Sequence, residues 1–412
     1  MTSEQTLRAL FQSALDAALP DGKFTPFLPP KPKGRTLVLG AGKASARMAQ
    51  AFEREWNAPC AGLVVTRYGH AAPTRHIEIV EASHPVPDAA GRAGAERLLA
   101  LAQSAGPDDL VVFLISGGAS ALLSLPAKGV SFEDKQAVTK ALLKSGAPIG
   151  AMNQVRKSLS AIKGGRLAAA ASRAQLVTFL VSDVPGDDPA AIGSGPTIAD
   201  PVARGEVREI LQRYGVDLPP HLFAVIDANT APSPAPRHAI HMLATPMMSL
   251  QAAAGRAREL GLHPVILGDA IEGEAREVAR AFAGIARAQR SHKTLAPAPC
   301  VLLSGGETTV TVRGKGRGGR NAEFLLALTE ALGDMRGFAA IACDTDGIDG
   351  MEDNAGVWTD AAALADPRAA RLKIADYLAR NDAYSWFQAL DRLVMTGPTL
   401  TNVNDFRAII VE

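Results

Sequence analysis

The stretch Ser304–Glu323 reads SGGETTVTVRGKGRGGRNAE and combines a small-residue turn, a β-branched run and a glycine-rich basic segment. It follows the apolar run Cys300–Leu303, which predicts a buried strand, so its SGG turn is expected at the carboxyl end of that strand. Ligands bind at this end of the strands in open α/β sheets. The run Thr308–Val312 predicts a further strand, and helical spacing begins at Asn321. The stretch therefore predicts an α/β fold with a ligand site.

The glycine-rich segment of this stretch alternates four glycines with four basic side chains, the last of which is Arg320. Glycine allows a backbone to approach a ligand closely, and a guanidinium group binds phosphate oxygens through two parallel hydrogen bonds. The helix that follows would direct its N-terminal amides at the same place, so the segment predicts an anion site. A solvated flexible loop is the alternative, and an ion pair between Arg320 and Glu323 is another role for this arginine.

A second strand, turn and helix is predicted near the N-terminus. The run Thr36–Leu39 leads into Gly-Ala-Gly and Lys43, and a helical pattern follows. This loop is neither a Walker A loop nor a complete GxGxxG. The run Asp109–Ile115 leads into another SGG turn, at 116–118. The repeated order of strand and turn favours a shared anionic ligand, and the alternative for Lys43 is an exposed lysine in a tight turn.

Acidic turns follow two other predicted strands. Ser182–Pro189 contains three aspartates, and Asp344–Gly350 contains three more. Mg²⁺ in phosphoryl-transfer sites takes one or two carboxylates and completes its shell with water and phosphate oxygens. The first turn therefore predicts a metal site at Asp183 and Asp188, and the alternative is that these aspartates are only turn formers. His84 follows another strand, and its loop favours a structural role over a ligand role.

Composition limits the class of protein. The 412 residues are 47% hydrophobic, and 43 Lys and Arg face 42 Asp and Glu, so no overall charge attracts nucleic acid or a membrane surface. The three cysteines are widely separated, which fits a reducing compartment. No secretory signal or membrane-spanning run is recognised, so a cytoplasmic protein that binds small molecules is expected. The sequence leaves the oligomeric state open, a homo-oligomer included.

A proline-rich stretch at 228–237 is the predicted linker between two domains. We expect an N-terminal Rossmann-like three-layer domain over residues 1–225 and a C-terminal α/β domain over residues 238–412, with the ligand cleft between them. Residues 1–35 include a predicted helix, Thr2–Leu19, which could pack on the second domain.

Ten separated motifs resemble one known family. They are LGAGKAS (39–45), ASHPVPD (82–88), ISGGASAL (115–122), MNQVRKSLSAIKGGRLA (152–168), SDVPGDD (182–188), GSGPT (193–197), SGGET (304–308), GRGGRNAE (316–323), TDGIDG (345–350) and GPTLTNVND (397–405). Together they resemble the class II glycerate 2-kinases, the MOFRL family. The resemblance implies ATP- and Mg²⁺-dependent phosphorylation of D-glycerate to 2-phospho-D-glycerate. Members of that family have often been labelled hydroxypyruvate reductases.

The resemblance also implies roles for individual residues. It carries the catalytic lysine and arginine of the family onto Lys43 and Arg320. The other residues expected to bind nucleotide or substrate are Gly40, Gly42, Ser116, Gly117, Gly118, Ser120, Asn153, Arg156, Ser194, Gly195, Thr197, Ser304, Gly305, Gly306, Glu307, Asn321, Asp346 and Asn402.

Two other functions remain open at the level of the sequence. An NAD(P)H-dependent hydroxypyruvate reductase would use GAGKAS as a dinucleotide loop, but the third glycine is missing. The acidic residue that would hold the ribose is also missing, because the strand 62–65 ends at Thr66 and Arg67. A sugar-acid-binding protein without catalytic activity would explain the anion site but not the two acidic turns.

Overall fold

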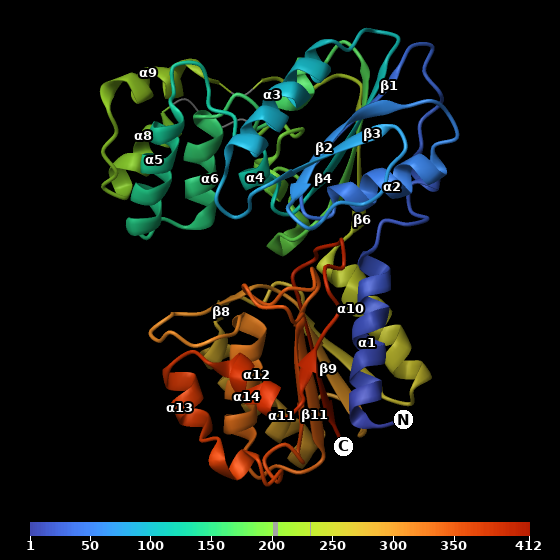
Figure 1. Cartoon of the computed structure of the whole chain (residues 1–412), viewed down its shortest axis with the longest axis vertical. Coiled ribbons are helices and arrows are strands. Elements are labelled where there is room, and N and C mark those ends of the chain that lie inside the picture. Colours follow the sequence, from blue (N-terminus) through green and yellow to red (C-terminus); the bar gives the residue numbers. More distant parts are fainter. Residues whose placement is uncertain (201–204, 231) are drawn as a thin grey trace. The chain divides into compact units, whose positions relative to one another are not determined.

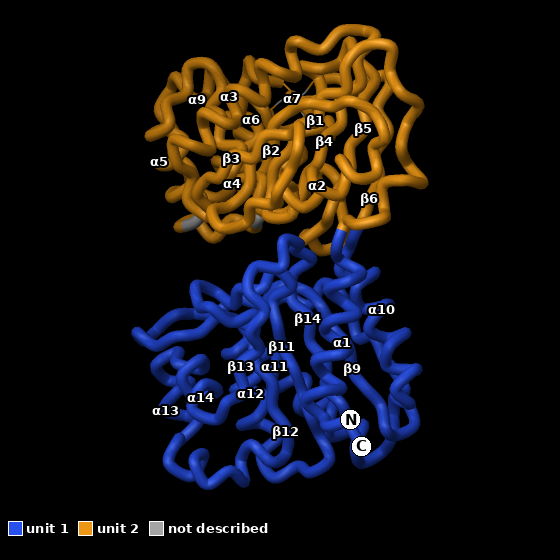
Figure 2. The backbone as a smooth tube through the Cα atoms, turned by 45° about the vertical axis from the view of Figure 1, so that its right-hand side comes forward, with its two compact units in different colours: residues 1–19, 244–412 blue, residues 20–243 orange. Residues whose placement is uncertain are grey.

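The computed structural model describes residues 1–200, 205–230 and 232–412 (Figure 1). The chain forms two compact units (Figure 2). Residues 20–243 form one, the inserted unit, and residues 1–19 with 244–412 form the other, the outer unit. The predicted α/β fold with two domains is confirmed. Within the described residues, no helix is long and apolar enough to cross a membrane.

The division of the chain differs from the predicted one at both ends of the inserted unit. Strand β6 (His238–Ala244) was expected to open the second domain, but it lies at the edge of the inserted unit's sheet. The boundary therefore falls at residue 243. Helix α1 (Ser3–Ala18) belongs to the outer unit, whereas residues 20–35 stay with the inserted unit.

The sheet of the inserted unit has the strand order β3-β2-β1-β4-β5-β6. Strands β1 to β5 pair in parallel. The apolar runs of β1, β2, β4 and β5 are buried as the sequence predicts, whereas that of the edge strand β3 is only partly buried. The chain adds strands on one side of β1 and then on the other, so the order reverses between β1 and β4. This reversal is the topological switch point at which Rossmann-like sheets bind ligands. The bounds are β1 Thr36–Ala41, β2 Ala61–Arg67, β3 Ile77–Ala82, β4 Leu110–Ser116 and β5 Gln175–Val181.

Helices cover both faces of this sheet. On one face Leu39, Val65 and Phe113 pack against α3 (Ala89–Gln103), α4 (Ala119–Leu122) and α7 (Arg166–Ala170). On the other face lies α2 (Ser45–Glu55), whose Phe52 meets Phe24, and Phe24 meets Phe179 of β5. The central strands are therefore closed to water on both sides, which leaves the carboxyl-end turns as the place for chemistry.

Four more helices of the inserted unit form a cluster with a core of its own. Val138, Leu142, Val155, Ile210 and Leu222 are buried in that core. The helices are α5 (Phe132–Lys144), α6 (Ile149–Ser158), α8 (Glu206–Arg213) and α9 (Pro220–Ala228). The first begins at a capping box of Ser131 and Asp134, and the last two were not predicted.

The outer unit is a three-layer α/β/α structure with the strand order β13-β12-β11-β14-β9-β7. Alternate residues of β9 face opposite layers. Val301 and Leu303 pack against α1 and α10, and Cys300 and Leu302 pack against α11 and α12. The bounds are β7 His263–Gly268, β9 Cys300–Ser304, β11 Phe338–Asp344, β12 Gly356–Asp360, β13 Leu393–Val394, β14 Asp405–Val411, α10 Pro246–Glu259, α11 Ala275–His292, α12 Arg320–Leu332, α13 Ile374–Ala379 and α14 Ala383–Ala389.

The strand predicted over 308–312 is shorter in the structure. Only β10 (Thr308–Thr309) is a strand, and it pairs with β8 (Gly273–Glu274). Beyond it, Thr311 is exposed and donates its backbone N–H to the Glu274 carboxylate. A hydrogen bond to a side chain therefore takes the place of the backbone pairing between strands at this point. Short 3-10 helices cover Thr25–Phe27, Pro185–Asp187, Ile192–Ser194 and Ala369–Arg371.

Candidate active site

The two predicted turns of the inserted unit meet at the switch point. The backbone N–H of Lys43 donates to the Gly117 carbonyl (2.8 Å), and the N–H of Ala44 donates to the Ser116 hydroxyl (3.0 Å). Gly42 has a φ of 135°, and a Cβ there would lie 2.1 Å from Ser116 Oγ. The glycine that was expected to admit a ligand is thus required for packing of one turn against the other.

Lys43 and His84 converge over the second of these turns. A Cβ on Gly118, whose φ is 82°, would lie 3.2 Å from Lys43 Cγ and 3.3 Å from His84 Nε2. Burial, and then the charge of Lys43, lower the pKa of His84 to about 4, so its imidazole is neutral at pH 7. The sequence favoured a structural role for His84 and did not predict that it lies close to Lys43. Its position just beyond the carboxyl end of β3 was the signal that could have indicated this.

The other predicted residues of the inserted unit lie around the same end of the sheet. Ser120 Oγ is 2.8 Å from Ser194 Oγ, so the GSGPT turn is joined to the SGGAS turn. Gly40 packs β1 against β4, since a Cβ there would lie 2.3 Å from the Leu114 carbonyl oxygen. Gly195 accepts the N–H of Gly165 (2.8 Å). Thr197 is buried, and Asn153 and Arg156 lie half-buried on α6.

The two aspartates predicted to bind metal follow β5. Asp183 is half-buried, whereas Asp188 is exposed and its Oδ1 accepts the N–H of Ala190 (2.9 Å). In the described part of the chain, no three His, Cys, Asp or Glu side chains are grouped so that they could hold a metal ion. A cation that takes one or two carboxylates and otherwise water and phosphate oxygens still fits this turn.

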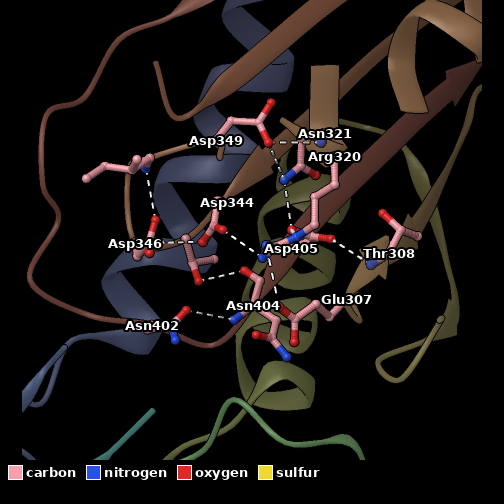
Figure 3. Close-up of polar contacts among 12 residues, drawn as sticks. Glu307, Thr308, Arg320, Asn321, Asp344, Asp346, Asp349, Asn402, Asn404 and Asp405 are labelled. Carbon is pink, nitrogen blue, oxygen red and sulfur yellow. Dashed lines mark hydrogen bonds and ion pairs between the residues drawn. The ribbon is translucent and has the colours of Figure 1, made fainter. Parts of the chain in front are cut away.

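Arg320 opens helix α12 of the outer unit amid carboxylates (Figure 3). Its Nε donates to Asp405 Oδ1 (2.8 Å) and its Nη2 to Asp344 Oδ2 (2.7 Å), while Nη1 lies 3.5 Å from Glu307 Oε1. The alternative ion pair with Glu323 is wrong, because Glu323 is buried and pairs with Arg276. Arg320 therefore joins the end of β11 and the start of β14 to the turn that follows β9.

The backbone amides at the start of α12 already have an acceptor within the chain. Asp349 accepts the N–H groups of Asn321 (3.0 Å) and Ala322 (2.8 Å), as Figure 3 shows for Asn321. Gly319 leaves room for this, since a Cβ there would lie 2.3 Å from Asp349 Oδ1. The anion predicted at this helix terminus is thus a carboxylate of the same chain.

Asp349 makes the stability of the outer unit depend on pH. Burial raises the pKa of Asp349 from 3.8 to about 7. Between these values the unfolded chain releases the proton and the folded chain keeps it. The stabilisation of the folded state by proton binding at Asp349 is therefore complete below pH 4 and is lost as the pH rises to about 7. We expect the melting temperature of the protein to fall relative to that of Asp349→Asn between pH 4.5 and 7. Equal slopes for the two proteins would contradict this assignment.

The remaining predicted residues of the outer unit surround Arg320. Ser304, Asp346 and Asn402 are buried, and Glu307 is exposed. Asp346 accepts the N–H of Ile348 (2.9 Å), and Asn402 accepts the N–H of Asn404 (3.3 Å). Gly305 and Gly306 form the turn after β9, and a Cβ on Gly306 would lie 2.2 Å from the nitrogen of Ile271.

Sequence reasoning missed a second arginine at this cluster. Arg407, on β14, is 1% exposed and forms an ion pair with Asp405, and it also donates to the Gly305 carbonyl (3.3 Å) and Thr308 Oγ1 (3.1 Å). Asp405 is thus held between two guanidinium groups. The predicted last strand begins with this arginine, but the local sequence does not indicate that its side chain is buried.

Comparisons with known proteins agree with the motifs. Residues 6–227 match the model of a domain of unknown function (DUF4147), and residues 300–405 match the MOFRL family. A provisionally named hydroxypyruvate reductase of Agrobacterium vitis is 51% identical, covering 100% of this chain and 95% of that protein. D-glycerate 2-kinase of Thermotoga maritima is 37% identical, covering 96% and 95%. The crystal structure of a Thermotoga maritima glycerate kinase matches with a TM-score of 0.90 and 35% identity over 100% of both chains.

Proposed function

This chain belongs to the class II glycerate 2-kinases, the MOFRL family, and we propose that it uses ATP and Mg²⁺ to phosphorylate the 2-hydroxyl of D-glycerate. It is a phosphotransferase that acts on an alcohol group. In this reaction the bond between the γ-phosphorus and the bridging oxygen of ATP breaks and the 2-oxygen of glycerate bonds to phosphorus. The hydroxyl proton leaves, and the products are ADP and 2-phospho-D-glycerate.

The observation that supports this proposal best is the pair of turns at the switch point. Phosphoryl transfer requires positioning and neutralisation of charge more than covalent catalysis. We assign Lys43 to the phosphoryl group, because its turn lies at the carboxyl end of β1 and its side chain extends over the SGG turn. Arg320 is assigned a second contact, through the Nη1 that faces the exposed side of its cluster.

A hydroxypyruvate reductase is the competing function, because a close relative carries that name. Dinucleotide-binding sheets use an acidic residue at the end of β2 for the ribose hydroxyls. Here β2 ends at Arg67, and the Thr66 hydroxyl donates to the Gly42 carbonyl (3.1 Å). An arginine at this position disfavours a dehydrogenase that uses NADH, which lacks the 2′-phosphate that such a cation would bind.

One experiment distinguishes the two activities. The purified protein is incubated with D-glycerate, ATP and Mg²⁺, and separately with hydroxypyruvate and NADH. We expect ADP and 2-phosphoglycerate in the first mixture and no oxidation of NADH in the second. Oxidation of NADH without formation of a phosphorylated product would reject the proposal.

The metal is proposed to bind at Asp183, which would share it with phosphate oxygens and water. When bound, Mg²⁺ neutralises the charge of the transferring phosphates. Asp183→Asn is expected to raise the Mg²⁺ concentration for half-maximal activity by about ten-fold, on the scale of losing one charged ligand. Asp217→Asn removes an exposed carboxylate of the same unit and serves as the control. An unchanged Mg²⁺ dependence in Asp183→Asn would move the assignment to Asp346 or Asp349.

A further inference from the structure

A buried lysine, Lys163, contacts the turn that follows the switch point. Its Nζ donates to the Ser120 hydroxyl (2.6 Å) and also to the Ser120 carbonyl. Ser120 lies on α4, directly after the SGG turn, and its hydroxyl meets that of Ser194. Lys163 itself is 2% exposed. One ammonium group and two hydroxyls therefore converge behind the turn that contacts Lys43.

Two further cations flank Lys163. Lys135, on α5, is 8% exposed, and its Nζ donates to Ser124 Oγ at 3.5 Å. Arg156, on α6, is half-buried. In the described part of the chain, none of these three cations forms an ion pair with a carboxylate. Lys157 is the contrast, because it pairs with Asp200 at 2.6 Å.

This arrangement is costly without a ligand. Burial of a charge costs free energy unless a partner compensates it. Burial, then the charges of Lys135, Arg156 and Lys157, hold the pKa of Lys163 well below its usual range. Burial, then Arg156, lower the pKa of Lys135 to about 8. A small anion between these groups would supply the missing countercharge.

We propose that Lys163, Lys135 and Arg156 form the subsite that binds the carboxylate of the acid substrate, with the Ser120 and Ser194 hydroxyls as further donors. This rests on the proposed function, in which the enzyme binds two different anions, the nucleotide phosphates and a carboxylate. Lys43 is assigned to the phosphoryl group, so a second cationic site at the same end of the sheet is available for the acid. Arg156 is the most exposed of the three cations and would lie at the entrance.

The subsite predicts uptake of a proton on binding. A carboxylate beside Lys163 favours its charged form and so raises a pKa that burial and the neighbouring cations hold well below its usual range, which predicts proton uptake. The charged groups that face it are Lys135 from α5 and Arg156 and Lys157 from α6, the last already paired with Asp200. Calorimetric titration of D-glycerate at one pH in buffers of different ionisation enthalpy measures this uptake.

The decisive experiment is titration of D-glycerate into the full chain without nucleotide. Lys163→Met and Arg156→Met are each expected to weaken binding by about 10- to 100-fold, the range for loss of a charged hydrogen bond. Lys140→Met, an exposed lysine on α5, removes the same charge and should change nothing. Glyceramide, which lacks the carboxylate charge, should bind the parent and both test variants with similarly low affinity.

Other outcomes reject the proposal. Weaker ATP binding with unchanged glycerate binding would make this a phosphate site, and unchanged binding of both would make the lysines structural. If Lys163→Met does not fold, Arg156→Met still tests the proposal. Among the described residues the Arg156 side chain forms no hydrogen bond, so its replacement should not prevent folding. A parent protein that binds D-glycerate but does not phosphorylate it would refute the proposed function and leave the subsite standing.

Discussion

Lys43→Ala is expected to lower turnover with D-glycerate and ATP by about 10²- to 10³-fold, the scale for removing one contact that stabilises charge in a transition state. The main-chain hydrogen bond between Lys43 and Gly117 does not involve the side chain, so the junction of the two turns should persist. The melting temperature should therefore change little. Steady-state kinetics and thermal denaturation measure the two quantities.

Lys33→Ala is the matched control for this change. Lys33 is exposed and lies just before β1, so the substitution removes the same charge from the same unit. It should leave turnover unaltered. If Lys43→Ala turned over as fast as Lys33→Ala, Lys43 would be no more than a solvated side chain and its assignment to the phosphoryl group would fail.

Arg320→Lys should lower turnover by about 10²-fold although it keeps the charge. Arg320 donates from Nε to Asp405 and from Nη2 to Asp344, and a single ammonium cannot reproduce this fork. The loss should fall on turnover more than on nucleotide binding, since the proposed contact of Nη1 is with the group being transferred. Some stability is expected to be lost too, because Asp344 and Asp405 are buried carboxylates.

Arg317→Lys provides the comparison, since Arg317 also forms a two-nitrogen ion pair, with Glu352, but its side chain is 52% exposed. Exposed pairs contribute little, about 0–1 kcal/mol, so this variant should resemble the parent. The kinetic constants are measured well below each variant's melting temperature. A loss of stability in Arg320→Lys with normal turnover of the folded enzyme would restrict Arg320 to its clamping role.

The sequence predicted strands β1 to β5 of the inserted unit well, and most clearly β1 and β4, because each of these two is an apolar run that leads into a glycine turn. The domain boundary was misplaced for a physical reason. Proline marks irregular chain, as it does before β6, but it carries no information on which sheet the next strand will join. Membership of β6 in the first sheet depends on long-range pairing, which local composition does not encode.

The site of the outer unit likewise depends on long-range contacts that the local sequence does not encode. Arg320, Asn321 and the helix they begin were predicted, and an anion at the start of that helix was expected on sound electrostatic grounds. The anion proved to be Asp349, 28 residues beyond Asn321. The sequence contained both partners, but nothing in their spacing indicated that one would cap the other. Lys163 was likewise visible in its motif, and only the fold places its ammonium on Ser120.

Helix α1 is synthesised before the inserted unit but packs with residues that are synthesised after it. Its Arg8 donates to the Leu393 carbonyl (3.1 Å), and the Thr401 hydroxyl donates to the carbonyl of Ala18 (2.8 Å). At about 5–20 residues per second, translation of residues 20–243 takes roughly 10 to 45 seconds. During that interval the apolar side of α1 has no sheet to cover. A nascent chain must therefore keep this segment from aggregating until residues 244–412 have been synthesised, and chaperone dependence should concentrate there.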